Sequence, residues 1–325
     1  MSERMAAIFA AGLLLLAASG GSAHTRIPVE TRNAALRYWL AFAELQDPPA
    51  DRSTTELLEK TAAGDAAWDE AKLGPILDAN SAAIGIMQRA TKLPECDWGL
   101  EYSQGPRASI AYIPKARVLA RLNTLQGMRL AAKEDTRGAV NDWLAGIRFS
   151  QHLGKGGSLI FSLVAGKALV SNLHAVIQAA QNGKLTEAQK KQVESAVRAL
   201  PEAGFDWGQA MWYEEATMPI TIAQMHEAPN PAAYYQEMMG EPAPSQFSIP
   251  KESDVAAFHK LMANVEEALR LPPQQADDKL KLLQNSVGAL HEFFQRTIPS
   301  FVKVNEARKA VQKARMALLQ TLSEK

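Results

Sequence analysis

The sequence has a single cysteine, Cys96, among its 325 residues. One thiol cannot form a disulfide within its own chain, so covalent cross-links cannot hold the fold together. A chain of this length buries roughly three quarters of its unfolded surface and can fold on its hydrophobic core alone. We therefore expect Cys96 to be a buried small apolar side chain; a free thiol or a link between two chains is the alternative.

An excess of charge is also missing, because 35 basic residues are balanced by 35 acidic ones. Proteins that bind nucleic acid rely on a broad positive field that attracts phosphates. A formally neutral chain lacks that field, so we expect no nucleic-acid partner.

The common catalytic and metal-binding motifs are absent. The sequence has no HExxH, Glu-x-x-His, CxxC or GxSxG, the patterns of zinc proteases, di-iron proteins, redox enzymes and α/β-hydrolases. "SIPK" at 248–251 matches Ser-x-x-Lys, but about one such match is expected by chance and no Lys-Thr-Gly accompanies it. "HLGKGGSLIF" at 152–161 has no strand before it, so it indicates a helix stop at Gly154 and an N-cap at Ser158 rather than a phosphate loop. We expect no cofactor.

The N-terminus has the three parts of a secretory signal. Arg4 gives a positive start, residues 6–18 are apolar, and Gly21-Ser22-Ala23 offers small residues for cleavage. The apolar run is shorter than the roughly 20 residues of a membrane-spanning helix. We expect residues 1–23 to be removed and residues 24–325 to form a single exported domain, periplasmic or extracellular. An uncleaved N-terminal anchor is the alternative.

No second segment predicts a membrane span. The most apolar stretch, residues 158–180, is interrupted by Lys167, Asn172 and His174. Polar residues inside an apolar run of this length are typical of a buried core helix.

Apolar residues recur at three- and four-residue spacing along almost the whole chain, while sustained period-two alternation is missing. The sequence therefore predicts an all-α fold without a β-sheet. We expect helices at 33–45, 53–62, 66–72, 75–91 (with Pro75 in the first turn), 114–133, 136–153, 158–181, 186–199, 206–227 (interrupted at Pro219), 231–239, 252–270, 275–297 and 300–323.

Short connections between these helices predict stacked antiparallel hairpins, in one domain with two possible layers at 33–199 and 200–325. Residues 120–153 have a weak tetratricopeptide-like pattern of small and large residues. The residues concerned are Gly127, Leu130, Ala139, Trp143 and Gly146.

Three stretches resemble a group of exported, all-helical bacterial proteins with no assigned activity. They are "NAALRYWLAFAEL" (33–45), "CDWGLEYSQGP" (96–106), and the helical pair at 116–156 with the long apolar helix after it. The resemblance covers roughly residues 33–215 and rests on the pattern and order of these segments. It implies an all-helical fold and export, and it supplies no catalytic residues.

One sequence motif, Leu-Pro-Glu followed by Asp-Trp-Gly, occurs twice: "LPECDWGL" at 93–100 and "LPEAGFDWGQ" at 200–209. In each copy Leu-Pro ends a helix and the aspartate begins the next turn or helix. Asp206 has the spacing of a helix cap, whereas Asp97 is expected to cap only a turn. We interpret the repeat as a joint between helical layers, and a two-part binding site is the alternative. The candidate binding residues near it are Trp98, Tyr102, Trp207, Trp212, Glu214 and Glu215.

Stacked helical hairpins build concave surfaces that bind other chains. We therefore predict a non-enzymatic exported scaffold that binds a peptide, a protein or a component of the cell envelope. One alternative is a hydrolase that uses Glu214, Glu215, His226 or His291. Another is a metal-binding protein, because the thioethers of Met218 and Met225 and the imidazole of His226 suit Cu(I). The same methionine spacing is typical of a core stripe.

Overall fold

Helices make up the regular structure of the computed structural model, which describes residues 31–108, 110 and 112–324. The candidate signal peptide and its cleavage site lie outside these residues. Within the described chain the β-type pairing is limited to an isolated bridge between Asn33 and Glu95. The predicted all-α class without a sheet is confirmed.

Residues 33–325 form one unit by their mutual contacts. Its helices are α2 (Ala34–Glu44), α3 (Arg52–Ala63), α4 (Glu70–Ala79), α5 (Ser81–Ala90), α6 (Ile113–Ala132), α7 (Thr136–Gly154), α8 (Leu159–Gln181), α9 (Glu187–Arg198), α10 (Trp207–Glu227), α11 (Pro231–Met239), α12 (Glu252–Arg270), α13 (Pro273–Ser286), α14 (Glu292–Thr297) and α15 (Phe301–Ser323), with 3-10 turns η1 (Tyr102–Arg107) and η2 (Val287–Ala289).

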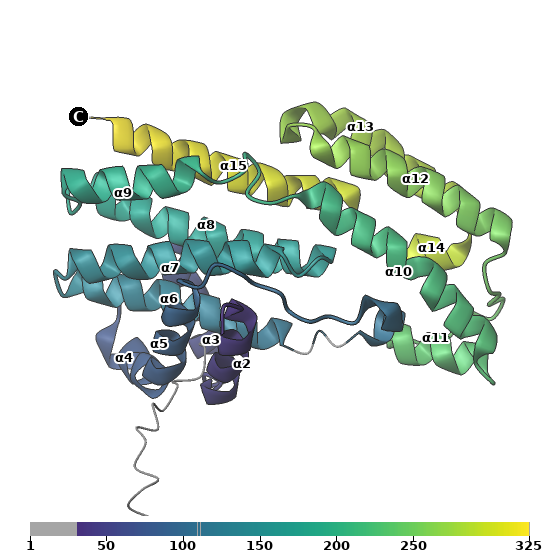
Figure 1. Ribbon diagram of the computed structural model, residues 1–325, viewed down its shortest axis with the longest axis horizontal. Coiled ribbons are helices and arrows are strands. Elements are labelled where there is room, and N and C mark those ends of the chain that lie inside the picture. The colour runs from purple at the N-terminus through teal and green to yellow at the C-terminus, as the bar shows by residue number, and fades with distance from the viewer. Residues whose placement is uncertain (1–30, 109, 111, 325) are drawn as a thin grey trace, which may run out of the picture. The chain divides into compact units, whose positions relative to one another are not determined.

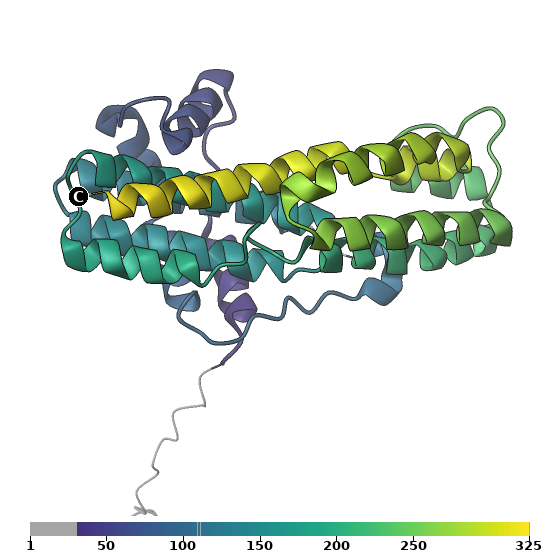
Figure 2. The same ribbon diagram turned by 90° about the horizontal axis from the view of Figure 1, so that it is seen from above.

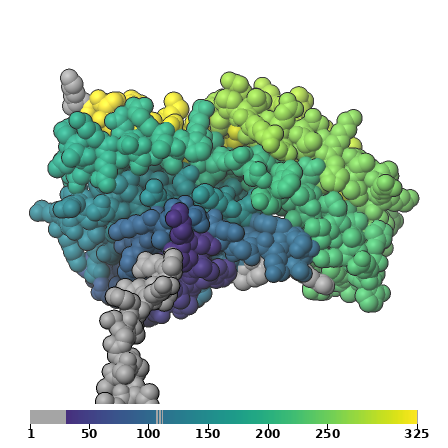
Figure 3. Space-filling view, in the orientation of Figure 1, coloured from purple at the N-terminus to yellow at the C-terminus, as the bar shows by residue number. Residues whose placement is uncertain are grey.

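The centre of this unit is a stack of α6, α7 and α8 (Figure 1). The connections at 133–135 and 155–158 are short, so α7 runs antiparallel to both of its neighbours, as predicted for hairpins. Helices α3 and α4 pack on α6, and α2 packs on α5. Figure 3 shows segment 92–108, in blue, lying on the surface of the face seen in Figure 1.

The C-terminal helix joins the two ends of the unit. Helices α10, α12 and α13 pack in succession, and α15 then runs from α13 back along α8 and α9 (Figure 2). Because α15 lies on the central stack, buried residues from 33–199 and from 200–325 belong to one core.

Helix α8 has the length and composition of a membrane span. Its most apolar 18-residue window has a mean hydropathy of 1.6, and 56% of that window is buried inside the unit. It contacts α3, α6, α7, α10 and α15, which is the position of the core helix predicted from the sequence. Its buried Asn172 donates from Nδ2 to the Ala168 carbonyl oxygen at 2.8 Å, while Asn172 Oδ1 is buried and accepts no hydrogen bond within the described residues.

Aspartate caps decide where several helices begin. In each case a carboxylate oxygen accepts the backbone N–H three residues further on, which satisfies one of the free donors of the first turn. The aspartates are Asp51, Asp69, Asp135 and Asp206. The cap predicted at Asp206 is therefore present.

The prediction that a helix begins at Pro75 is wrong. Helix α4 starts five residues earlier, after the Asp69 cap, and contains Pro75 in its interior. The break comes instead at Asn80, whose side chain accepts from the Gln46 N–H and donates to the Ile76 carbonyl oxygen, both at 2.9 Å. A side chain that binds two backbone groups can end a helix that propensity alone would continue.

Two further helix boundaries differ from the prediction. Helix α10 is continuous through Pro219, because burial of Met211 and Met225 on the same face of the helix outweighs the one lost backbone hydrogen bond. The helix predicted at 275–297 ends at Ser286, and α14 starts anew after His291, whose Nδ1 accepts the Phe293 N–H.

Candidate functional site

The predicted binding residue Trp98 lies in the core. It is 5% exposed, stacks on Tyr112 with ring centroids 4.7 Å apart, and its Nε1–H donates to the His152 carbonyl oxygen at 2.9 Å. The neighbouring Cys96 is only half-buried, although burial raises the pKa of its thiol to about 12. Trp98 therefore holds segment 92–100 against the end of α7.

Trp207 is also buried, but its position is different. It is the first residue of α10, and its Nε1–H donates to the Ala203 carbonyl oxygen at 2.9 Å. In the other copy Asp97 accepts the Gly99 N–H and closes a turn, as expected. The two tryptophans are core residues in two different local structures, and neither indole lines the surface grooves along α7 or between α6 and α8.

Three other candidates, Tyr102, Glu214 and Met218, line one pocket of 400 Å³ among η1, α10 and α14. Tyr102 packs on Tyr213 with ring centroids 4.6 Å apart. Glu214 Oε1 accepts the Leu159 N–H at 2.8 Å, and burial raises the pKa of this carboxyl.

Glu214 thus occupies the N-terminus of α8, where the sequence predicted a cap from Ser158. The Ser158 side chain makes no capping bond. A side chain from α10, 55 residues away in sequence, serves instead.

The remaining acidic and aromatic candidates point elsewhere. Glu215 Oε1 bonds His259 Nδ1 on α12 at 2.8 Å, so the two adjacent carboxylates serve different helices. Trp212 is 45% exposed beside Tyr213.

The predicted metal ligands are likewise separated by helix geometry. Met225 is 0% exposed in the core, while the adjacent His226 is exposed to solvent. Among the described residues no group of three or more His, Cys, Asp or Glu side chains is placed to hold a metal ion.

One serine–histidine pair has the composition of a hydrolase site. Ser248 Oγ and His291 Nε2 are 3.0 Å apart. However, His291 Nδ1 accepts the Phe293 N–H at 3.2 Å, so a neutral ring carries its proton on Nε2. That proton is donated to Ser248, and the imidazole cannot take the serine proton as a general base would.

A groove of 1070 Å³ runs along the exposed face of α7. It is bounded by the end of α5 and segment 91–94 on one side and by α9 on the other. The stretch 141–155 of α7 forms its floor and is about 21 Å long at the helical rise. Its hydrogen-bonding and charged side chains are Gln88, Thr91, Lys92, Asn141, Asp142, Arg148, Gln151, His152, Lys155, Gln192 and Ser195. We name it the α7 groove.

Two titratable side chains in the α7 groove have perturbed pKa values. Burial raises the pKa of Asp142 to about 7, and the charge of Asp135 acts in the same direction. Burial lowers the pKa of His152 to about 4, and Lys155 and Arg148 add to this effect. Burial thus disfavours the charged form of both side chains, and Lys92, Arg148 and Lys155 give the groove a net positive charge.

His152 is held in one tautomer from below the groove. The Tyr38 hydroxyl lies 2.7 Å from His152 Nδ1, and burial raises the pKa of Tyr38 well above its usual value. Because Nδ1 is the one acceptor at hydrogen-bond distance from this buried hydroxyl within the described residues, we assign Tyr38 as the donor, which places the ring proton on Nε2.

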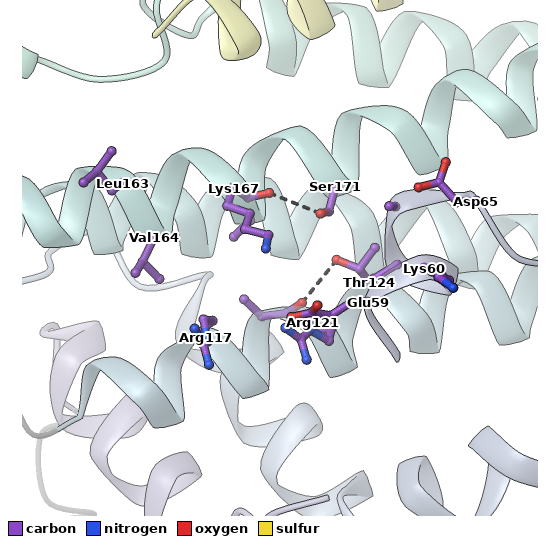
Figure 4. Close-up of a pocket in the computed structure, with 14 residues that line it drawn as sticks. Glu59, Lys60, Asp65, Arg117, Arg121, Thr124, Leu163, Val164, Lys167 and Ser171 are labelled. Carbon is purple, nitrogen blue, oxygen red and sulfur yellow. Dashed lines mark hydrogen bonds and ion pairs between the residues drawn. The ribbon is translucent and has the colours of Figure 1, made fainter. Parts of the chain in front are cut away.

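A second groove, of 390 Å³, lies between α3, α6 and α8 (Figure 4). Arg117 and Arg121 project from α6, and Lys167 projects from α8 on the opposite wall. We name it the α6–α8 groove.

The sequence prediction missed both grooves. The one sequence feature that indicates the α7 groove is a row of polar residues at 141, 148, 151 and 155. These spacings place the four side chains on one face of a helix, opposite the buried Trp143 and Ser150. Such a stripe is also the pattern of any solvated helix, and the walls come from α5 and α9, which are distant in sequence.

Comparison with family models, with curated proteins and with solved structures finds no match to this chain. The resemblance to exported helical proteins stays a prediction from the sequence.

Proposed function

We propose that this chain is an exported helical scaffold that binds an extended acidic peptide segment in the α7 groove. The observation that carries the proposal is the groove itself, a cleft of 1070 Å³ whose floor is a single helix face. A floor about 21 Å long accommodates about six residues of an extended chain at 3.3 Å per residue.

The lining of the groove suits a peptide backbone. Two amide side chains, Asn141 on α7 and Gln192 on α9, offer both donors and acceptors to a chain laid across α7, whereas Gln88 Nε2 already donates to Asn123 Oδ1. Extended peptides are commonly held by hydrogen bonds to the main chain, with a few side-chain contacts for specificity.

The charge of the groove favours acidic sequences. Arg148 and Lys155 lie on the floor, and Lys92 lies at the α5 end. The opposing carboxyl, Asp142, has its pKa raised to about 7 and carries only part of a negative charge at neutral pH. Complementary charge steers the encounter and selects between partners.

Export is the second part of the proposal and rests on residues 1–23 of the sequence. In a periplasmic or extracellular setting the partner would be a secreted protein or an envelope protein with an exposed acidic segment. Fractionation of the producing cells, with N-terminal sequencing of the mature chain, tests this part by itself.

The binding site is tested by filling the groove. Ala196 lines it from α9, whereas Ala188 is exposed on the same helix away from the groove. We expect Ala196→Trp to abolish the binding of short synthetic peptides rich in Asp and Glu, and Ala188→Trp to leave it unchanged, in fluorescence anisotropy titrations. Lys-rich peptides of the same length serve as the charge control. Equal binding of acidic and basic peptides, or equal loss in both variants, would contradict the proposal.

A further inference from the structure

The α6–α8 groove concentrates positive charge on two facing walls. Arg117 and Arg121 are four residues apart on α6, so their side chains lie one turn apart on the same face. Lys167 reaches down from α8 toward α6 (Figure 4). Like charges at this spacing repel each other, so the arrangement costs stability without a counter-charge.

Only part of this charge is neutralised by the chain. Glu59 Oε1 accepts from Arg121 Nη2 at 2.8 Å. Within the described residues Arg117 and Lys167 have no carboxylate at ion-pair distance. Burial lowers the pKa of Arg121, the charge of Arg117 acts in the same direction, and Glu59 opposes them. The remaining charged lining residues, Lys60 and Asp65, lie at the α3 end and carry opposite charges; Lys60 is 3.8 Å from Glu56 Oε2 on its own helix.

Most of the uncharged lining is apolar. Ala62, Ala120 and Ala168 come from three different helices, and Leu163 and Val164 close the wall on α8. The floor is concave because three helices contribute to it. Such a surface encloses a chain, whereas binding to a lipid bilayer requires an apolar face that projects.

Two hydroxyl groups in the groove are already used by their own helices. Thr124 Oγ1 donates to the Ala120 carbonyl oxygen at 3.2 Å, and Ser171 Oγ donates to the Lys167 carbonyl oxygen at 3.2 Å (Figure 4). Neither proton is available to a ligand. The two hydroxyl groups therefore add no free hydrogen-bond donor to the groove.

We propose that the α6–α8 groove binds a monomeric long-chain carboxylate, with the carboxylate between Arg117 and Lys167 and the hydrocarbon chain along Ala120 and Ala168. The two unpaired cations supply charge-assisted hydrogen bonds to the head group. The apolar floor gains from removing the chain from water. This site is independent of the α7 groove, which lies across α7 from it and takes a different class of ligand.

The test uses the mature protein and decanoate at concentrations below micelle formation, measured by isothermal titration calorimetry. Decyltrimethylammonium has the same chain with the opposite charge. We expect decanoate to bind about tenfold more tightly or better, since only its head group makes charge-assisted contacts with Arg117 and Lys167. Equal affinity for the two amphiphiles would overturn the proposal.

Substitutions in the α6–α8 groove test whether decanoate binds there. We expect the double variant Arg117→Gln, Lys167→Gln to bind decanoate at least about tenfold more weakly, because the head group loses both charge-assisted contacts. Ala168→Trp should abolish binding of either amphiphile. The matched controls are Lys260→Gln and Ala256→Trp, at exposed positions of α12, and they should bind as the parent does. Both target and control changes lie at surface-accessible positions, and circular dichroism checks that each variant is folded.

Two further outcomes would contradict the proposal. Decanoate binding that survives Ala168→Trp would show that the ligand lies elsewhere. Cosedimentation with vesicles of anionic phospholipid, without binding of monomeric decanoate, would show that the cations contact a membrane surface instead.

Discussion

The Tyr38 hydroxyl donates a hydrogen bond of 2.7 Å to His152 Nδ1 across 114 residues of sequence. The contact joins α2 to the end of α7, beneath the α7 groove. Both residues are buried, with 0% and 5% of their surface exposed. A polar pair in this position contributes to stability only while both partners are present.

Tyr38→Phe should therefore destabilise the protein by about 1–3 kcal/mol, because it leaves His152 Nδ1 buried without a donor. Urea unfolding followed by circular dichroism measures the change. Tyr112→Phe is the matched control: the Tyr112 hydroxyl is buried and makes no hydrogen bond in the described structure, so its removal should cost little or stabilise the fold. Equal losses in the two variants would show that the Tyr38–His152 bond contributes nothing specific.

His152 should make the protein less stable as the pH falls from about 6.5 to about 4. The pKa of His152 is about 4 in the folded state and 6.5 in the unfolded chain. Between these values the unfolded chain binds a proton that the folded protein does not bind. As the pH falls, the free energy of unfolding therefore decreases by up to about 1.4 kcal/mol per pH unit. His152→Gln should remove this slope. The readout is the urea midpoint at a series of pH values, and an unchanged slope in the variant would be the contrary result.

Asp142 should have the opposite effect over almost the same range. Its pKa is about 7 in the folded protein and 3.8 in the unfolded chain. As the pH rises from about 4 to 7, the unfolded chain loses a proton that the folded protein keeps, so the free energy of unfolding decreases. Asp142→Asn should be more stable than the parent at pH 8, by roughly 1–4 kcal/mol, and nearly equal to it at pH 4.

The two slopes partly cancel in the parent protein. Its stability should accordingly change little between pH 4 and 6.5, while each single variant exposes the contribution of the other residue. A parent profile as steep as that of either variant would contradict the assigned protonation states.

Glu214 gives a further prediction at the start of α8. Glu214→Ala removes the acceptor of the Leu159 N–H and should cost about 1–2 kcal/mol of stability. Glu214→Gln keeps an acceptor oxygen and removes a buried carboxyl whose pKa is raised, so it should cost less than half as much at pH 8. Thermal unfolding of the two variants at that pH compares them directly. A glutamine variant as unstable as the alanine variant would show that the charge itself holds the helix end.

The helical fold was largely predictable, because most elements are specified by local signals. Three- and four-residue apolar spacing predicts the helices of the central stack, and an aspartate such as Asp206 predicts a start. The prediction failed at Pro75, Pro219 and His291. Near Pro75 the side chain of Asn80 sets the helix end, and at Pro219 burial of one face keeps α10 continuous. At His291 a side-chain cap starts a new helix. In each place these interactions outweigh the local preference of the residue.

The candidate site was less predictable. The aromatic repeat drew attention to Trp98 and Trp207, which the structure places in the core. Tyr102, Glu214 and Met218 do meet in one pocket. Asp142 and His152 were missed, because a perturbed pKa comes from burial by neighbouring helices and leaves no motif in the sequence.

The sequence by itself determines that this chain is all-helical, neutral in charge and without an internal disulfide, because periodicity, charge and cysteine content are properties of composition and local order. The tertiary structure alone decides where its grooves lie. Their walls join α5 to α9 and α6 to α8, and their charges matter through the groups that face them. Arg117 and Lys167 are ordinary surface cations in the sequence, and they face each other only because α6 and α8 pack side by side.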